Sequence, residues 1–185
     1  MKIAVASIGA LNSELLGEAS RSIGDRFGAS TECHSKIAIP ENSMDARRQQ
    51  FSSIAFMLAL TRGFPAGADR FIGLTECDLF IPMLTFVFGQ AQLNGRVALV
   101  SLARLRQEFY GMAPDPDLLR LRLAKEIGHE LGHSFGLIHC SDRGCVMSLS
   151  TSIQEVDRKS PEFCGSCARL LPRRTVEPVF EGKEA

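Results

Sequence analysis

The feature that most constrains this chain is an eleven-residue segment, residues 129–139, which reads HELGHSFGLIH. Side chains four residues apart on a helix are neighbours, so His129 and His133 can hold one metal ion together. Gly136 can adopt a left-handed backbone conformation that ends the helix, which lets the chain turn back and bring His139 to the same ion. The chain has four histidines, and three of them lie in this segment. The spacing therefore predicts a helix that ends in a metal site.

The ligand set predicts a catalytic site rather than a structural one. Three neutral imidazoles leave the fourth position of a tetrahedral zinc ion open for water. Zinc lowers the pKa of such a water from 15.7 to about 7 and polarises a substrate carbonyl. Glu130 lies between His129 and His133 in the sequence, where it can take the proton of the attacking water and pass it to the leaving amine. The alternative is a polar helix face with satisfied core histidines, and the extended spacing weighs against it.

The helix that carries this segment has a well-marked start. Asp115 is a capping residue and Pro116 suits the first helical position, so the helix is expected to run to about Phe135 and to break at Gly136. At 100° per residue, one face is apolar and the opposite face carries the two helical histidines. We expect the apolar face to pack on the core and the histidines to face a cleft; the apolar side chains are Leu123, Ala124, Ile127, Leu131 and Phe135.

The first half of the chain alternates between strand-like and helix-like segments, which is typical of an α/β unit. Right-handed crossovers would lay the helices against a twisted mixed sheet. The expected helices are Ser13 to Phe27, closed by Gly28, and Asp45 to Thr61. The expected strands are Lys2 to Ile8, Thr31 to Ile39, a run starting at Arg70 to Leu74, and, on either side of a turn from Gly89 to Gly95, Leu84 to Phe88 and Arg96 to Ser101.

Four of the six cysteines cluster near the C-terminus and predict a second metal site. They are Cys140, Cys145, Cys164 and Cys167, and the last two form a CxxC pair. Four soft thiolates with no open position suit a structural zinc ion. Two disulfides or an iron–sulfur cluster are the alternatives, but clustered thiols without a convincing secretion signal more often bind metal. Because Cys140 adjoins His139, this zinc would fix the C-terminal lobe to the catalytic site.

Composition limits the partners. Lys and Arg together number 21, as do Asp and Glu, and this balance argues against a nucleic-acid binder that works through phosphate contacts. No apolar run reaches the ~18 residues of a membrane span. The apolar run from Ile3 to Leu11 is interpreted as a buried strand rather than a signal peptide, since Ser7 interrupts it. We expect a monomer in the reducing cytoplasm, with Cys33 and Cys77 as small core residues.

The residues that follow the third histidine resemble those of one family. Cys140 is followed by four residues and then by Cys145, Val146 and Met147, with CGSC downstream at residues 164–167. Together with the long histidine motif, this pattern resembles the archaemetzincins, which are metzincin-type zinc peptidases. The likeness covers the chain to about Pro172. It includes the strand that begins Lys2-Ile3, FVFG at residues 86–89 and RLRQEFYG at residues 104–111.

The resemblance implies a metzincin-like α/β (α+β) fold, in which an N-terminal twisted mixed sheet with helices is followed by the active-site helix and a small C-terminal lobe with a structural zinc. We expect one catalytic domain over residues 1–172, with lobes over about 1–136 and 137–172, and a loosely held tail at 173–185. By the same resemblance, Met147 is the methionine of the Met-turn beneath the catalytic zinc.

The resemblance also implies a function: a zinc metallopeptidase with two zinc ions, acting on peptide or protein substrates. Aminopeptidase-like activity on short peptides is associated with the family. Leu84 to Phe88 is the candidate edge strand that would receive the substrate as an added antiparallel strand, although an inner strand without a substrate role stays open. A zinc-retaining peptide-binding protein with little turnover and a non-peptide amide hydrolase are the alternatives. Glu130 weighs against the first, because zinc binding alone does not require it.

Overall fold

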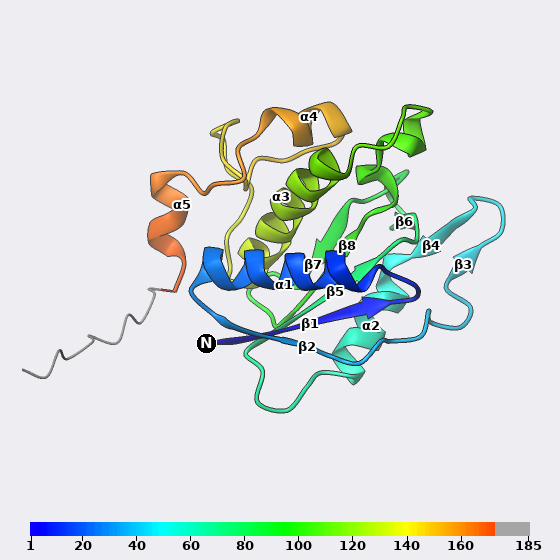
Figure 1. Ribbon diagram of the computed structural model, residues 1–185, viewed down its shortest axis with the longest axis horizontal. Coiled ribbons are helices and arrows are strands. Elements are labelled where there is room, and N and C mark those ends of the chain that lie inside the picture. Colours follow the sequence, from blue (N-terminus) through cyan, green and yellow to red (C-terminus); the bar gives the residue numbers. More distant parts are fainter. Residues whose placement is uncertain (173–185) are drawn as a thin grey trace, which may run out of the picture.

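The computed structural model describes residues 1–172, in which a five-stranded sheet lies between helices (Figure 1). The strand order is β2-β1-β5-β8-β7. Neighbours among the first four strands pair in parallel, and β7 runs antiparallel to β8 at one edge, so the sheet is mixed as predicted. The strands are β1 (Lys2–Ile8), β2 (Ser30–Cys33), β5 (Arg70–Thr75), β7 (Gly89–Ala91) and β8 (Val97–Ser101).

Helices cover both faces of the sheet. On one face lie α1 (Ser13–Phe27) and α3 (Pro116–Ser134), and on the other lies α2 (Ser53–Arg62) (Figure 1). Alternate residues of β1 point to opposite faces, so Ile3 and Val5 join the core under α1 and α3, while Ala4 joins the core under α2. Because both faces are buried, the inner strands β1, β5 and β8 are near-continuous apolar runs, unlike the edge strands β2 and β7.

The remaining elements are short. A small second sheet is formed by β3 (Met44–Asp45), β4 (Gln50–Ser52) and β6 (Leu79–Phe80). Two 3₁₀ turns, Ala103–Leu105 and Gln107–Tyr110, lead toward α3. Beyond α3 come α4 (Ile153–Arg158), which packs on α3, and α5 (Gly165–Leu170).

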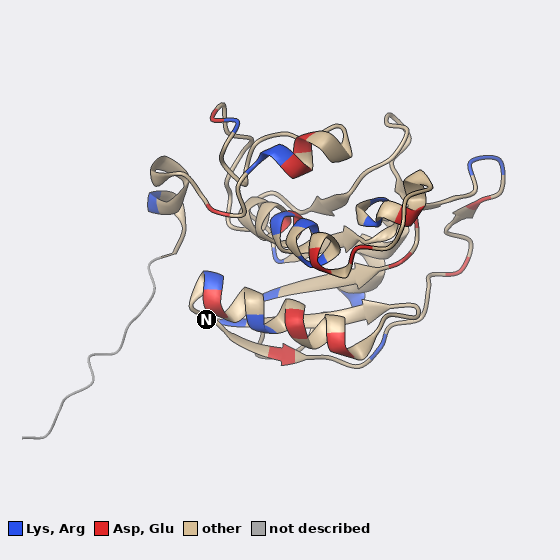
Figure 2. Cartoon of the chain, turned by 45° about the horizontal axis from the view of Figure 1, so that its top comes forward, with Lys and Arg blue, Asp and Glu red and all other residues tan. Residues whose placement is uncertain are grey.

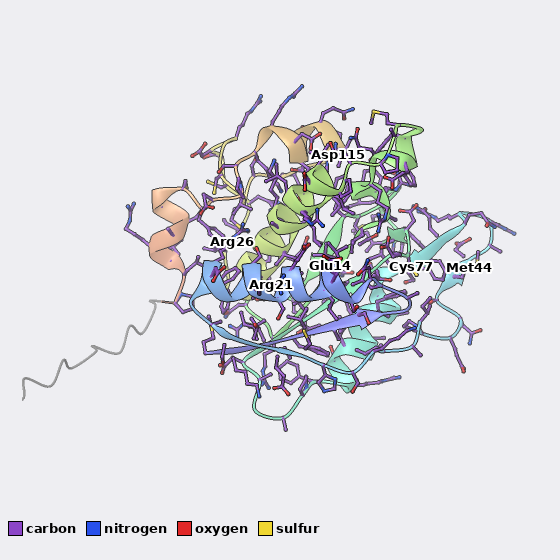
Figure 3. All side chains as sticks on the ribbon, in the orientation of Figure 1. Glu14, Arg21, Arg26, Met44, Cys77 and Asp115 are labelled. Carbon is purple, nitrogen blue, oxygen red and sulfur yellow. The ribbon has the colours of Figure 1, made fainter. Side chains whose placement is uncertain are left out.

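Two predicted helices have the predicted boundaries because their caps form. The Asn12 side chain accepts a hydrogen bond from the Glu14 N–H at 2.8 Å, and Gly28 ends α1 with a φ of 59°. At the start of α3, the Asp115 side chain accepts from the Leu118 N–H at 2.9 Å, with proline at the next position (Figure 3).

The helix predicted over Asp45 to Thr61 is shorter than expected, with 10 residues. The Asp45 carboxylate accepts hydrogen bonds from the N–H groups of Arg47 and Arg48, which closes a turn instead of a helix. Gln49 then takes a φ of 56°, and Gln50 enters β4. Helix α2 starts only at Ser53.

Two predicted strands also differ from the structure. The strand expected over Thr31 to Ile39 ends at Cys33, and further on Ile37 makes an isolated bridge with Ile8. The run from Leu84 to Phe88 makes only one bridge, between Val87 and Leu79. The edge strand is instead β7, which begins at the start of the predicted turn.

The two cysteines outside the cluster differ in burial. Cys33 is exposed and Cys77 is partly buried, so Cys33 is not a core residue. Within residues 1–172, no helix has the length and apolar character needed to cross a membrane. The tail predicted over residues 173–185 lies outside the described residues.

Candidate functional site

Helix α3 carries two imidazoles, those of His129 and His133, that lie side by side. His129 Nδ1 lies 2.9 Å from the carbonyl oxygen of Val146, and His133 Nδ1 lies 2.7 Å from that of Leu137. Each Nδ1 must carry the proton that it donates, which leaves both Nε2 atoms as bare acceptors. These two Nε2 atoms are 3.1 Å apart. Lone pairs at this distance repel one another unless a cation lies between them.

The third imidazole arrives after the helix ends. Gly136 has a φ of 93°, and its N–H donates to the His133 carbonyl at 2.9 Å. The chain then reverses and places the His139 ring 5.3 Å from the His129 ring and 4.9 Å from the His133 ring, between centroids. One nitrogen from each ring lies within 4.8 Å of the other two. The three predicted histidines are therefore brought together.

The surroundings favour neutral imidazoles, the form that binds metal. Burial lowers the pKa of all three rings, and the charge of Lys159 lowers each further. The effect is largest at His129, whose pKa falls well below its ordinary range because only 6% of the residue is exposed.

Glu130 is buried next to these rings and against the edge strand. A Cβ atom at Gly89 of β7 would lie 2.6 Å from both Cγ and Oε1 of Glu130. Burial raises the pKa of Glu130 well above its ordinary range; the charge of Glu126 raises it further and that of Lys159 opposes the shift. A carboxylate with a raised proton affinity is suited to accept a proton.

Met147 lies beneath α3. Its side chain is fully buried, and its sulfur packs so closely on Gly132 that a Cβ atom there would collide with it. The Met147 carbonyl accepts from the Cys140 N–H at 2.9 Å, while the preceding carbonyl, of Val146, holds His129. This turn therefore supports the histidine site and the cysteine cluster at once.

The four clustered cysteines converge beside this turn. Their sulfur atoms all lie within 4.8 Å of one another, and no disulfide links them. Cys140 Sγ is 3.8 Å from Cys164 Sγ, and the Cys164 N–H donates to Cys145 Sγ at 3.3 Å. Hydrogen bonding from the Cys167 backbone lowers the pKa of Cys164 to about 7, which favours the thiolate form.

Comparison with known proteins identifies the family. Residues 62–173 match the sequence profile of peptidase family M54. The chain is 42% identical over 176 residues to the archaemetzincin of Methanocaldococcus jannaschii, covering 95% of this chain and 96% of that protein. It is 50% identical over 138 residues to the archaemetzincin of Methanopyrus kandleri, covering 75% of each. This chain belongs to the archaemetzincins, peptidase family M54.

Solved structures of archaemetzincins share the fold. The crystal structure of the Methanopyrus kandleri archaemetzincin aligns with a TM-score of 0.81 at 41% identity, covering 92% of this chain and 93% of that one. A zinc-dependent peptidase from Methanocorpusculum labreanum aligns with a TM-score of 0.82 at 29% identity, covering 92% and 100%. The predicted fold class is confirmed, and the protein is a zinc metallopeptidase.

The donor sets of this archaemetzincin fit two zinc ions. Tetrahedral zinc with bonds of about 2.3 Å to sulfur requires sulfurs about 3.8 Å apart, whereas a disulfide bond is about 2.0 Å long. The 3.8 Å between Cys140 and Cys164 matches the first value. For nitrogen at about 2.0–2.1 Å the corresponding separation is about 3.3 Å, close to the 3.1 Å between His129 and His133. The histidine set suits a catalytic zinc and the cysteine set a structural one.

A cleft of about 310 Å³ opens at the histidine site. Two segments contribute to its lining: Leu84 to Ala91, which includes β7, and Leu149 to Thr151, after the Met147 turn. The three histidines and Glu130 line the same cleft. Glu126 and Lys159 also line the cleft.

Three residues that line the cleft, Gly89, Glu126 and Lys159, are not identified by the sequence motifs. Gly89 ends the FVFG segment and starts the predicted turn, but neither pattern gives it a role at the site, and Lys159 follows a short helix without any motif. The position of Glu126, one turn before Glu130 on the same helix, was a signal that could have identified it.

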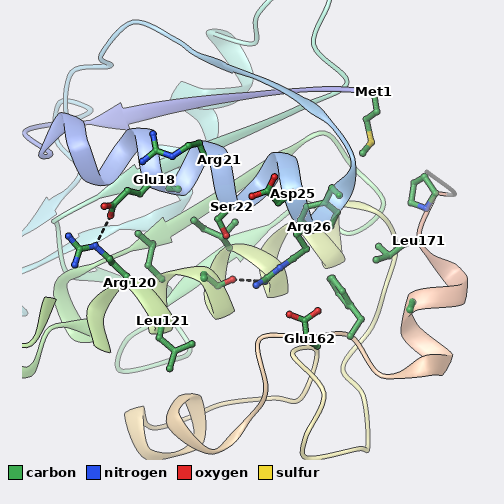
Figure 4. A pocket seen from close by; sticks show the side chains of 18 of the residues that line it. Met1, Glu18, Arg21, Ser22, Asp25, Arg26, Arg120, Leu121, Glu162 and Leu171 are labelled. Carbon is green, nitrogen blue, oxygen red and sulfur yellow. Dashed lines mark hydrogen bonds and ion pairs between the residues drawn. The ribbon is translucent and has the colours of Figure 1, made fainter. Parts of the chain in front are cut away.

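A larger cavity, of about 1190 Å³, lies elsewhere between α1, α3 and α5 (Figure 4). Its walls are tied by Arg120 Nε donating to Glu18 at 2.7 Å and by Arg26 Nη1 donating to the Ala124 carbonyl at 2.6 Å. None of the seven predicted metal ligands lines it, and neither does Glu130. The smaller cleft, not the larger cavity, contains the histidine site and Glu130.

Proposed function

We propose that this M54 peptidase hydrolyses peptide bonds at the histidine site, with Glu130 as general base. In this proposal His129, His133 and His139 hold the catalytic zinc. The structural zinc is held by the four thiolates of Cys140, Cys145, Cys164 and Cys167. The observation that carries the proposal is the pair of bare Nε2 atoms 3.1 Å apart, with each Nδ1 already bound to a carbonyl.

In this proposal, Glu130 and the backbone carbonyls around the histidines have separate roles in hydrolysis. When bound, zinc supplies a Lewis acid and an acidified water. Glu130 accepts a proton as the water oxygen bonds to the scissile carbonyl carbon. It returns that proton to the amine nitrogen as the C–N bond breaks, so that a carboxylic acid and an amine result. The carbonyls of Val146 and Leu137 hold His129 and His133 in the tautomer that points Nε2 at the ion.

We propose short peptides or chain termini as substrates, with aminopeptidase-like cleavage as the expected mode. The modest volume of the cleft, about 310 Å³, supports small substrates. The burial of Glu130 beside Gly89 supports turnover over the alternative of a zinc-retaining peptide binder, which has no need for a base there. A non-peptide amide would require the same groups and is the remaining alternative.

We further propose that residues 1–172 form a single catalytic domain that acts as a monomer without a nucleic-acid partner. Charges of both signs are interspersed on the surface, and α1 and α3 each carry both (Figure 2). This distribution supports the absence of a phosphate-binding face. The thiols of the cysteine cluster require reducing conditions, which supports a cytoplasmic location.

The test is a peptide-library digest with the wild type and with Glu130→Gln. Glutamine has a similar shape but cannot accept the proton, and general acid–base catalysis contributes about 10²–10⁴-fold, so we expect a rate loss in at least that range. Elemental analysis should give about two zinc ions per chain in both proteins. Glu14→Gln, an exposed change on α1, serves as the control and should keep the wild-type rate.

Wild-type rates in Glu130→Gln would remove Glu130 from the mechanism. Peptides that bind the wild type but are never cleaved would favour the peptide-binding alternative.

A further inference from the structure

A buried ion pair lines part of the cleft at the histidine site. Lys159 Nζ lies 2.8 Å from Glu126 Oε1, and the two side chains are only 1% and 4% exposed. Both residues line the cleft, together with Ser150. None of the three belongs to the proposed metal or base set.

These three side chains share an unusual property. Within residues 1–172, five buried side-chain nitrogen or oxygen atoms lack a hydrogen-bond partner, and three of the five are Glu126 Oε1, Ser150 Oγ and Lys159 Nζ. The ion pair is therefore in contact but without hydrogen-bond geometry. Buried polar groups are normally hydrogen-bonded, so these three atoms, which all belong to residues of one cleft, are free to bond a substrate or water there.

Lys125 shows what a structural lysine looks like in the same region. It is equally buried, at 3% exposure, but its Nζ donates to the carbonyls of Val156 and Asp157, both at 2.9 Å. Lys159 has three donors, and among residues 1–172 the Glu126 carboxylate is its one ion-pair partner. Hydrogen bonds to the backbone therefore explain why Lys125 is buried, but they do not explain the burial of Lys159.

The pair lies in the same cleft as the proposed general base, Glu130. Glu126 precedes Glu130 by four positions on α3, which places their Cβ atoms about 5–6 Å apart. Lys159, paired with Glu126, lines the same cleft as Glu130 and the three histidines. A substrate held at the histidine site would thus have its neighbouring residue beside Lys159.

The charge of the site selects an anion. With zinc bound, its two positive charges exceed the one negative charge of Glu130, and the charges of Lys159 and Glu126 cancel. A carboxylate brings two oxygens that can accept from the spare Lys159 donors and from the Ser150 hydroxyl.

We propose that Lys159, assisted by Ser150, is a specificity residue that binds a carboxylate of the substrate adjacent to the scissile bond. The proposal rests on the proposed peptidase function and names the class of substrate. The carboxylate comes from an acidic side chain next to that bond or from the free C-terminus of a short peptide.

The experiment measures peptide binding by calorimetry to the two-zinc protein in the Glu130→Gln background, where cleavage does not interfere. One arm compares acetyl-Ala-Ala-Glu-Ala-amide with its Gln counterpart, and the other compares acetyl-Ala-Ala-Ala as the free acid and as the amide. We expect the acid to bind about tenfold or more tightly in at least one arm, as for a hydrogen bond to a charged group. The arm that responds identifies the source of the carboxylate.

The added variants are Lys159→Met and the double variant Lys159→Met with Glu126→Gln, which avoids leaving a buried carboxylate alone. Both should lose the preference while binding the amide peptides as before. Lys125→Met is the matched control, because it removes a buried lysine that does not line the cleft, and it should keep the preference.

Equal binding of acid and amide in both arms, or a preference that survives in the double variant, would overturn the carboxylate site alone. Failure of every peptide to bind would overturn the proposed peptide site as well. Zinc content and thermal melts of each variant establish that the fold and both ions are intact.

Discussion

Glu130 can occupy its position only because residue 89 has no side chain. A Cβ atom there would lie 2.6 Å from Glu130 Cγ and Oε1 and 2.7 Å from the Leu99 carbonyl oxygen. Real Cβ contacts essentially never come so close, so either the carboxylate or the edge strand would have to move. The placement of Glu130, the proposed general base, thus depends on a glycine of a different element.

Gly89→Ala is therefore expected to lower the hydrolysis rate at least tenfold while both zinc ions are retained, because a base displaced by even 1 Å loses its alignment with the water. Peptide hydrolysis rates and elemental analysis of the same preparation measure the two effects. Gly17→Ala is the matched control: its Cβ would have no neighbour closer than 3.6 Å, on α1, and should be tolerated. Full activity in Gly89→Ala would show that Glu130 is not positioned by this contact.

The residues that the sequence could identify are those related by local spacing. His129, His133 and His139 follow helix and turn periodicity, and the structure brings them together as predicted. Gly89 and Lys159 act through contacts with α3 from segments far away in the chain. No local pattern encodes such contacts, so these two residues required the three-dimensional structure.

At the scale of elements, α4 is held in place by α3. Arg122 donates two hydrogen bonds to the Asp157 carboxylate, both at 2.7 Å, and Lys125 donates to the last carbonyls of α4. A helix of six residues has little stability of its own. These bonds therefore fix α4 on α3, next to the segment that forms one wall of the cleft.

Asp157→Asn should lower the free energy of unfolding by about 1–3 kcal/mol, between the values for exposed and fully buried pairs. The reason is that Arg122 is 3% exposed whereas the Asp157 side chain is 36% exposed. Urea denaturation measures the change. Asp117→Asn is the control on the same helix; its side chain is 97% exposed beside Arg120, and the expected loss is below about 1 kcal/mol. Equal losses in both variants would contradict the role of Asp157.

The sequence predicts the bounds of helices and strands where a capping residue or a buried apolar run marks them. It does not predict them where distant side chains donate hydrogen bonds to the backbone. The run from Leu84 to Phe88 has strand-like composition, yet Arg48 and Gln50 donate to the carbonyls of Leu84 and Thr85 at 2.9 and 3.0 Å. These hydrogen bonds occupy carbonyls that a strand would pair with a neighbour. The edge position therefore falls to β7, three residues of modest β propensity that pair with β8.

At the scale of the whole molecule, the Met147 turn joins the two metal sites. Its backbone holds His129 through the Val146 carbonyl and Cys140 through the Met147 carbonyl, each at 2.9 Å. The cysteine cluster, in turn, closes a small buried core with Leu137, Val146 and Met147. The apolar core that surrounds the cysteines is thus small, and we expect its stability to depend on the four thiolates.

The two proposed zinc sites should therefore fail in different ways. Cys164→Ser leaves three thiolates and a weak fourth ligand, and binding free energy at such a site appears as folding free energy, so the melting temperature should fall and become zinc-dependent. His133→Ala should abolish activity and catalytic zinc with a much smaller loss of stability, since His133 faces the cleft while Ile127 and Leu131 keep the core contacts of α3. Thermal melts of both variants with and without added zinc make the comparison. A Cys164→Ser protein that melts like the wild type, beside a His133→Ala protein that unfolds, would mean that the roles of the two sites are reversed.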